Sequence, residues 1–499
     1  MDIFTEATLS AYFPNLVDIC ITDDGEPVYA ILKDGELIFT QEHVIETEIF
    51  SIPERKHFPF ELSRASKVEA FFNYDDVYLY DDVLEYLKRF SALDDEQWSI
   101  VAHYVFLTYL HDHPGIDYCP YLLFNAVPER GKSRTGKSII YAAFRGIHLI
   151  ELREATIFRY CQNLHGTLFF DLMDITKKAA RGNCEDILLG RYEKGSRCNR
   201  VLRPDQGPFN DMEYFETYGP TLIASNEPLD KILETRCLPI NMPNIPGNYE
   251  TPRPEHAVYL KERLTAWRAK HLSAAFDEIQ PIEGITGRLW DITKPLFLVS
   301  RLLNAQHRIL EDAILAIAGE KDQSRKESFE GRLFAIIKEI TDEKGQADSL
   351  EWHITINEIR ARFNQGRPED KHVSPQWIGR RLKNMSLTSR SIHGYSEIKI
   401  TAPEYETLLK QYGYVGRESA KPTKSLPEKG KEYQEHLGEV GSGRHSEHER
   451  PAFNSPEERE FYDETVQTLR EEGGRSEDEI RRMADEALEE WRKYDDVPF

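Results

Sequence analysis

The chain contains little cysteine, and none of it is arranged to hold a metal ion or a set of disulfides. Six cysteines are spread over 499 residues, without a C-x-x-C pair and without the Cys and His spacing of a zinc site. This scatter predicts buried, reduced side chains in a reducing compartment. The cysteines are Cys20, Cys119, Cys161, Cys184, Cys198 and Cys237.

Long apolar runs and surplus positive charge are also missing. No stretch of about 18 apolar residues is present that could span a membrane, and the opening segment MDIFTEATLS does not read as a signal peptide. We therefore expect a cytoplasmic protein without a membrane partner. The formal net charge is −23, which argues against a generally basic nucleic-acid-binding surface, so any such site has to be local.

The composition of the chain supports several folded domains. Hydrophobic residues make up 40% of the chain and aromatic residues 11%, which is enough for proper cores in roughly two to four domains. Residues 1–75 alternate short apolar stretches with Asp-Gly pairs, a hairpin pattern that predicts a small β-rich domain. Residues 76–118 have helical periodicity and predict a helical collar.

One stretch predicts a chemistry by its spacing: YLLFNAVPERGKSRTGKSIIYAAF, residues 121–144. An apolar run predicts a strand, and the pattern G-x-x-x-x-G-K-S then precedes a segment suited to a helix. Such a loop cradles phosphate with backbone N–H groups, while its lysine reaches the phosphate oxygens and its serine ligates Mg²⁺. We therefore expect ATP and Mg²⁺ to bind at Gly131, Lys132, Ser133, Arg134, Thr135, Gly136, Lys137 and Ser138.

Two alternatives bear on this motif. A second GKS lies at residues 131–133, but position 126 is Ala where the pattern needs its first Gly, so only the frame that ends at Ser138 fits. A short pattern can also match by chance in a surface loop. The strand before the motif and the helix after it favour nucleotide binding over that alternative.

A second strand of the nucleotide site is predicted further along the chain. GTLFFDLMDI is an apolar strand that ends in Asp171, the form expected of the strand whose aspartate holds Mg²⁺ through water. An ordinary buried strand that ends in Asp is the alternative. Hydrolytic ATPases usually have Glu in the next position, where this chain has Leu172, so Asp174 or Glu185 is the candidate for orienting the attacking water.

A basic segment and two single polar residues follow. RYEKGSRCNRVLRPDQGPFNDMEYFETYG predicts a hairpin with one basic limb, which would contact DNA or simply face solvent. The strand GPTLIASNE ends in Asn226, placed to touch the γ-phosphate or the attacking water. Arg236 precedes a further strand, where a surface salt bridge is the alternative role. The basic residues of the limb are Arg191, Lys194, Arg197, Arg200 and Arg203.

The run GKSRTGKS, FFD, YEKGSR, GPTLIASNE and TRCLPINMP resembles the ATPase core of superfamily 3-like AAA+ helicases and primase-helicases encoded by phages, plasmids and other mobile elements. The resemblance covers roughly residues 80–310. It implies an α/β P-loop NTPase core at residues 119–250 that works as a homo-oligomeric ring, a hexamer, with ATP between subunits.

The resemblance also assigns roles to single residues. Asn226 matches the sensor 1 position, and Arg236 matches the arginine finger that reaches the nucleotide of a neighbouring subunit. The hairpin before sensor 1 would enter a central pore and grip single-stranded DNA through Lys194, Arg197 and Arg200. The expected catalytic set is Lys137, Asp171, Asp174, Asn226 and Arg236, with Ser138 and Asp171 at the metal.

Two further modules follow the core. Residues 251–322 resemble the family's helical lid, in which Arg288 would contact nucleotide or form a structural salt bridge. Residues 323–416 predict three helices and a β wing, the order of a winged-helix module, whose third helix would enter the major groove. A protein-binding winged helix is the alternative. The residues expected to contact DNA there are Arg380, Arg381 and Lys383.

The end of the chain has a different composition. Residues 417–456 are rich in Lys, Glu, Gly, Ser and Pro and predict a disordered linker. Residues 457–499 combine capping signals with sparse apolar positions, which predicts an acidic helical tail that docks on a protein partner or stays solvated.

These features favour an ATP-dependent DNA helicase or translocase, or a replication-initiation ATPase, of a mobile element. An ATP-gated switch that assembles on DNA or protein without translocation is the alternative, and Leu172 favours it. A small-molecule kinase fits poorly, because the Arg236 segment and the winged helix would have no purpose. No primase motif is apparent.

Overall fold

The computed structural model describes residues 7–125, 130–207, 209–243, 247–303, 307–345, 351–392 and 395–414, with scattered residues between 462 and 488. The chain divides into two compact units, residues 1–416 and residues 417–499. Every strand in the described ranges belongs to the first unit.

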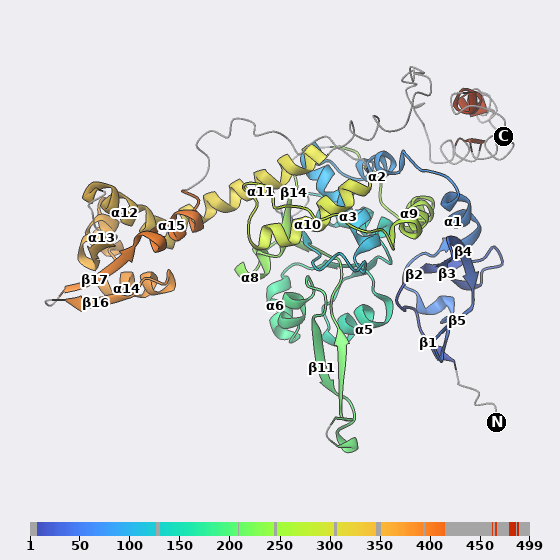
Figure 1. Ribbon diagram of the computed structural model, residues 1–499, viewed down its shortest axis with the longest axis horizontal. Coiled ribbons are helices and arrows are strands. Elements are labelled where there is room, and N and C mark those ends of the chain that lie inside the picture. Colours follow the sequence, from blue (N-terminus) through green and yellow to red (C-terminus); the bar gives the residue numbers. More distant parts are fainter. Residues whose placement is uncertain are drawn as a thin grey trace. The chain divides into compact units, whose positions relative to one another are not determined.

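A five-stranded parallel sheet, in the order β14-β8-β13-β10-β9, forms the centre of the first unit (Figure 1). The strands are short and mostly buried, as expected where helical crossovers cover a parallel sheet. The strands predicted before Leu172 and Asn226 are neighbours, β10 and β13. The strand bounds are β8 (Tyr121–Asn125), β9 (Ile147–Leu149), β10 (Leu168–Asp171), β13 (Thr221–Ser225) and β14 (Cys237–Asn241).

Helices connect these strands in sequence, which gives the α/β fold that the sequence predicts for the core. Carboxylates start two of them: the Asp174 side chain accepts from the N–H of Lys177, and that of Asp230 from the N–H of Ile232. The connecting helices are α4 (Lys132–Ala142), α5 (Glu154–Leu164), α6 (Ile175–Arg181), α7 (Glu185–Gly190) and α8 (Lys231–Glu234).

A two-stranded antiparallel hairpin lies between α7 and β13, where the basic segment predicts one. Strand β11 (Arg197–Val201) pairs with β12 (Met212–Glu216), and the short helix η2 (Pro204–Gln206) lies between them. Figure 1 shows this hairpin extending away from the central sheet. The Phe158 ring of α5 supports its base, 4.4 Å from the ring of Phe215.

Two small sheets form the N-terminal part, with strand orders β1-β6-β5 and β4-β3-β2-β7. The predicted hairpins are confirmed, since β2, β3 and β4 pair antiparallel around turns in which Gly25 and Gly35 have positive φ. The bounds are β1 (Thr8–Leu9), β2 (Leu16–Ile21), β3 (Pro27–Lys33), β4 (Glu36–Thr40), β5 (Glu42–Ile45), β6 (Glu48–Ser51), η1 (Arg55–His57) and β7 (Ser63–Arg64).

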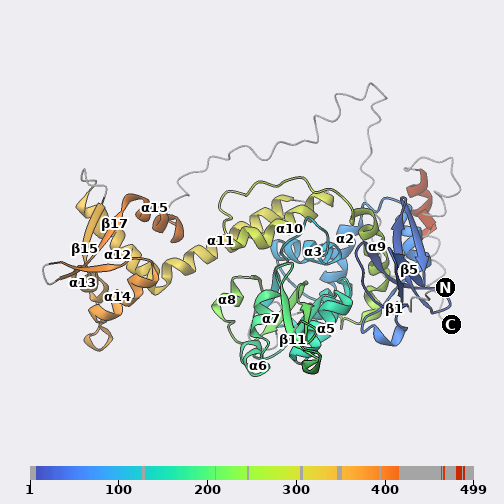
Figure 2. The same cartoon turned by 60° about the horizontal axis from the view of Figure 1, so that its bottom comes forward.

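Helices from before and after the sheet pack together. Helix α3 is buried on nearly all sides because α9, α10 and α11 surround it (Figure 2). The bounds are α1 (Ala65–Phe72), α2 (Leu79–Lys88), α3 (Asp95–Leu110), η3 (Pro254–Ala257), α9 (Val258–His271), α10 (Arg288–Leu302) and α11 (His307–Glu327).

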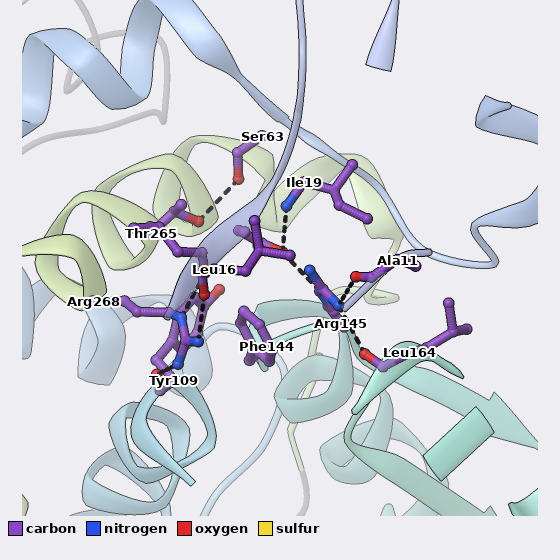
Figure 3. A network of polar contacts seen from close by, with 12 residues as sticks. Ala11, Leu16, Ile19, Ser63, Tyr109, Phe144, Arg145, Leu164, Thr265 and Arg268 are labelled. Carbon is purple, nitrogen blue, oxygen red and sulfur yellow. Dashed lines mark hydrogen bonds and ion pairs between the residues drawn. The ribbon is translucent and has the colours of Figure 1, made fainter. Parts of the chain in front are cut away.

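Buried arginines tie the N-terminal sheet to the rest of the unit (Figure 3). Arg268 of α9 donates to the carbonyl of Leu16 at 2.9 Å and to Asp112 Oδ2 at 2.7 Å. Arg145 donates to Asp18 Oδ1 at 2.7 Å and to the Leu164 carbonyl at 2.9 Å. Helix α9, predicted as part of a lid, therefore shares a core with β2, β3 and α1 instead.

Residues 329–412 have an apolar core of their own. Four α-helices pack against an antiparallel sheet in the order β15-β17-β16. Ser374 caps α14, with Pro375 as its first residue, where the sequence predicts the third helix. The bounds are α12 (Phe329–Lys344), β15 (Glu351–Thr355), α13 (Ile356–Asn364), η4 (Glu369–Lys371), α14 (Pro375–Asn384), β16 (Ser389–Ile392), β17 (Tyr395–Thr401) and α15 (Ala402–Gln411).

In the second unit, the described residues are helical, and Tyr462, Ala484 and Leu488 are buried together. The linker predicted at residues 417–456 lies outside the described residues.

Candidate functional site

The carboxyl ends of three strands lie side by side at one edge of the central sheet. The pairing register places Asp171 of β10 beside Ala224 of β13, and Ala224 beside Phe124 of β8. Helix α4 begins at this edge after β8. Open parallel sheets bind ligands in front of the carboxyl ends of their strands. Asp171, Asn226 and the start of α4, predicted separately, thus come together here.

Helix α4 begins at Lys132, not at the predicted phosphate lysine, Lys137. Gly131 precedes the helix with a φ of 83°, a left-handed conformation that favours glycine. The N–H groups at the positive end of the helix therefore include those of Lys132 and Ser133. Lys137 lies inside the helix, one turn beyond Ser133 on the same face. The expectation that the helix follows the pattern of residues 131–138 is wrong, because α4 begins inside that pattern.

Gly136 and Ser138 have packing roles. A Cβ atom on Gly136 would lie 2.2 Å from Cζ of Phe169 in β10, so glycine lets α4 approach the sheet closely. The Ser138 hydroxyl is fully buried and donates to the carbonyl of Thr135 at 2.8 Å. Because this hydroxyl is buried and already donates within its own helix, its position does not support the expected role of Ser138 at the metal.

Ser133, not Ser138, lies beside the carboxylate that is expected to hold the metal ion. Its Oγ donates to Oδ1 of Asp171 at 2.9 Å, so the first turn of α4 and the end of β10 meet through these two side chains. Lys132, beside Ser133, is buried. Position 126, whose Ala excluded this frame at the level of sequence, lies outside the described residues.

The electrostatics of this cluster favour an ionised carboxylate beside cations. Burial raises the pKa of Asp171, but His148, Ser133 and Lys137 outweigh it and bring the pKa below its usual range. Burial lowers the pKa of Lys132, and the charge of Asp171 opposes that effect. An ionised carboxylate and a hydroxyl are ligands that Mg²⁺ prefers, and a helix N-terminus with a lysine suits phosphate. The residues therefore fit a Mg²⁺–nucleotide.

The three candidates for orienting the attacking water differ in their contacts and in their exposure to solvent. Asp174 caps α6, because its Oδ1 accepts a hydrogen bond from the backbone N–H of Lys177 at 3.0 Å. The Nζ atom of Lys177 lies 2.7 Å from the Oδ2 atom of Asp174. The hydrogen bonds from Lys177 lower the pKa of Asp174, so it is ionised but already engaged. Glu185 is exposed at the start of α7. Asn226 is exposed just beyond β13, and its N–H donates to the Met173 carbonyl beside Asp171 at 3.3 Å.

Arg236 is buried at the opposite edge of the sheet, where its carbonyl accepts from the N–H of Tyr121 at the start of β8. Its guanidinium donates to the carbonyls of Leu189 at 2.8 Å and Ile232 at 2.5 Å. A side chain held in this way supports the fold, and reaching a neighbouring subunit would require both bonds to break. Arg288 is exposed and donates to Thr235 Oγ1 at 3.1 Å.

Two residues of the predicted basic limb are held inside the fold. The Lys194 ammonium donates to the carbonyl of His113 at 2.6 Å, and burial lowers its pKa. Arg191 is fully buried and donates to the carbonyls of Thr217 and Gly166, each at 3.0 Å. Neither residue lies on the hairpin strands. The structure therefore contradicts the expectation that Lys194 contacts DNA in its present conformation.

The hairpin itself carries charge that is already paired. Arg197 pairs with Glu216 at 3.1 Å, and Arg200 pairs with Glu154 of α5. The more open side chains are aromatic, with Phe209 96% exposed and Tyr214 61% exposed. Sequence analysis missed both residues, although aromatic residues next to basic ones are a recognised signal for binding single-stranded nucleic acid.

Helix α14 presents some of its predicted basic residues to solvent. Arg380 and Lys383 are exposed. Arg381 instead donates to Glu330 Oε1 at 2.8 Å and lies 5.8 Å from the ring of Phe329, and both contacts join α14 to α12. The DNA-binding prediction stays open for Arg380 and Lys383, while Arg381 has a packing role.

No family model matches the chain, and no curated protein matches it. Among solved structures, the active helicase Cch of SCCmec type IV is similar at 13% identity with a TM-score of 0.34, covering 82% of this chain and 81% of that one. The apo A form of the NrS-1 C-terminal region is similar at 10% identity with a TM-score of 0.31, covering 77% of this chain and 95% of that one.

Within the described ranges, no helix combines the length and the apolarity that crossing a membrane requires.

Proposed function

We propose that the protein is an ATP-hydrolysing enzyme whose nucleotide site lies at the carboxyl edge of the central sheet. The observation that carries this proposal is the bond from Ser133 Oγ to Asp171 Oδ1 at 2.9 Å, made where α4 begins behind Gly131. A helix N-terminus, a lysine, a hydroxyl and a carboxylate from a nearby strand are the parts that Mg²⁺–nucleotide chemistry requires.

In this proposal Lys132 replaces Lys137 as the phosphate lysine, and Ser133 replaces Ser138 at the metal. The N–H groups of the first turn of α4 would bind phosphate oxygens, and Asp171 would hold the metal ion. Bound Mg²⁺ would supply charge neutralisation at the phosphate oxygens. Lys137 adds positive charge near Asp171. Asn226, exposed beside this cluster, is the candidate for positioning the attacking water.

We further propose that hydrolysis serves work on DNA, as in a helicase, translocase or replication-initiation ATPase of a mobile element, by a cytoplasmic homo-hexameric ring. The β11–β12 hairpin supports this, because it offers Phe209 and Tyr214 for stacking with bases and the exposed Arg203 for a phosphate. Residues 329–412 have the element order of a winged helix, and Arg380 and Lys383 would contact duplex DNA.

An ATP-gated assembly switch is the second candidate function, and two observations favour it. Leu172 follows Asp171 where hydrolytic ATPases usually have Glu, and Asp174 is already bound to Lys177. Arg236, the expected finger, is buried and bonded to two carbonyls. Such a protein would bind ATP tightly and hydrolyse it slowly, with assembly on DNA or on a protein partner, for instance through residues 457–499, as the output.

Steady-state ATP hydrolysis during a titration with single-stranded DNA, combined with mass measurement in the presence of nucleotide, separates these functions. If the protein is a DNA helicase or translocase, we expect DNA to stimulate ATP turnover and nucleotide to promote formation of a ring. The switch predicts ATP binding with slow turnover that DNA does not change. A folded protein that binds no ATP would refute both.

A further inference from the structure

His148 lies next to the proposed metal site but belongs to neither of the predicted nucleotide motifs. It is in β9, the edge strand of the central sheet, and its register partner in β10 is Phe169. The two rings stack at 5.2 Å with an interplanar angle of 26°. Because side chains alternate along a strand, His148, Phe169 and Asp171 share one face of the sheet.

The imidazole faces Asp171. His148 Nε2 lies 3.5 Å from Asp171 Oδ2, within the distance of an ion pair but longer than a usual N–H···O hydrogen bond. This nitrogen is buried and has no hydrogen-bond partner in the described part of the chain. A buried nitrogen whose contact with the nearby carboxylate is this long is weakly satisfied, and a directly bound group would satisfy it better.

The other groups around Asp171 complete a set of three donors. Ser133 Oγ lies 2.9 Å from Oδ1 of the same carboxylate. The hydroxyl, the carboxylate and the imidazole nitrogen come from α4, β10 and β9, so three separate elements converge on one point of the sheet edge. A cation received there would meet two oxygen donors and one nitrogen donor.

We propose that His148 is a ligand of the metal ion held by Ser133 and Asp171, and that it makes this site favour Mn²⁺ over Mg²⁺ more than an all-oxygen site would. The inference rests on the proposed function, since it assumes that the edge receives a metal–nucleotide. Imidazole nitrogen is a good ligand for Mn²⁺ and other transition metals, whereas Mg²⁺ prefers oxygen. The simpler alternative is that His148 only packs on Phe169.

Pulsed electron paramagnetic resonance of Mn²⁺ bound with a non-hydrolysable ATP analogue separates ligation from packing. The wild-type protein is expected to show phosphorus coupling from the nucleotide and nitrogen coupling from a directly bound imidazole. The variant His148→Gln removes the imidazole. A cavity of about 290 Å³ borders this residue, so the substitution has room to be accommodated. The matched control is His103→Gln, because His103 also has a buried, unpaired Nε2, but in α3.

The expected result is loss of the nitrogen coupling in His148→Gln and its retention in His103→Gln. Mn²⁺ affinity in the presence of the analogue should fall at least about tenfold in His148→Gln, and Mg²⁺ affinity should fall less. Phosphorus coupling without nitrogen coupling in the wild type would overturn the role of His148 and leave the nucleotide site intact. Nitrogen coupling that persists in His148→Gln would also overturn it. No phosphorus coupling in the wild type would overturn the proposed function itself.

Discussion

Gly136 and Phe169 are in such close contact that a methyl group on Gly136 would lie 2.2 Å from the Phe169 ring. The contact joins α4 to β10, the two elements that carry Ser133 and Asp171. This glycine therefore sets the distance between helix and strand, and its place in the sequence pattern of a phosphate loop is incidental to that role.

Gly136→Ala should destabilise the protein, because the added methyl forces α4 away from β10. Overpacking of this kind costs about 1–3 kcal/mol, and thermal unfolding measures it. The matched control is Gly379→Ala, also within a helix, where the nearest atom to a new methyl is 3.6 Å away. That change should be neutral or stabilising, since alanine is the better helix former. Equal thermal stability of Gly136→Ala and wild type would contradict the packing role.

Two buried histidines should make the fold sensitive to mild acid. Burial lowers the pKa of His103 and of His111 to about 4, whereas an unfolded histidine titrates near about 6.5. The unfolded chain therefore takes up protons first as the pH falls. The stabilising effect of these histidines is complete above about pH 6.5 and is lost as the pH drops toward 4, at a cost on the order of 2 kcal/mol per residue by pH 5.

The measurement is thermal stability at pH 7 and pH 5 for the wild type and for the double variant His103→Gln, His111→Gln. The variant is less stable at pH 7 but should lose less on acidification. An unchanged pH dependence would show that other groups control the acid response.

Phe209→Ala should weaken binding of single-stranded DNA, because this side chain is the most exposed large apolar group at the hairpin. Base stacking contributes about 1–3 kcal/mol per aromatic side chain, so a fall of roughly five- to 150-fold in affinity is expected. DNA-independent ATP hydrolysis should not change, since Phe209 is remote in sequence and register from the Ser133–Asp171 pair. Val44→Ala, which removes a 60% exposed apolar side chain from the N-terminal sheet, is the control. Unchanged affinity for single-stranded DNA in Phe209→Ala would remove the main support for the proposed helicase or translocase function.

The double variant Arg380→Ala, Lys383→Ala should weaken duplex DNA binding and flatten its dependence on salt, because each exposed cation that meets a phosphate releases counterions. Arg381→Ala should instead lower the thermal stability of residues 329–412, since Arg381 pairs with Glu330. Fluorescence anisotropy with duplex DNA at several salt concentrations tests the first statement, and thermal unfolding of Arg381→Ala tests the second. If Arg381→Ala alone accounted for the lost binding, the assignment would be reversed.

Local patterns were enough to predict most elements of the fold. The Asp-Gly turns, the apolar strand before Leu172 and the Ser374 cap of α14 are short-range signals, and the structure has each of them. The sequence also predicted that Asp171 and Asn226 belong to one site. The structure adds that their strands, β10 and β13, are parallel neighbours that end at the same edge of the sheet.

The position of the phosphate helix could not be predicted in the same way. Residues 131–138 contain two GKS sequences. The sequence pattern excludes the first because position 126 is Ala and not Gly, but the helix begins within this first GKS, at Lys132. The deciding facts are tertiary: Gly136 packs on Phe169, and Ser133 reaches Asp171.

Single basic residues were equally hard to judge from sequence. Lys194 and Arg236 looked like surface cations, but carbonyls distant in sequence or one turn away bind them inside the fold. Their burial depends on how α7, β14 and the segment after α3 pack, which no local pattern encodes.

Binding of a fluorescent ATP analogue to Lys132→Ala and Lys137→Ala, with Mg²⁺ present and folding verified by thermal unfolding, tests the central claim most directly. Lys132 begins the helix beside Ser133, whereas Lys137 lies inside it. We predict that Lys132→Ala loses binding by at least about tenfold through the missing phosphate contact and that Lys137→Ala stays within a few-fold of wild type. Near wild-type binding in Lys132→Ala together with lost binding in Lys137→Ala would contradict the nucleotide site proposed here.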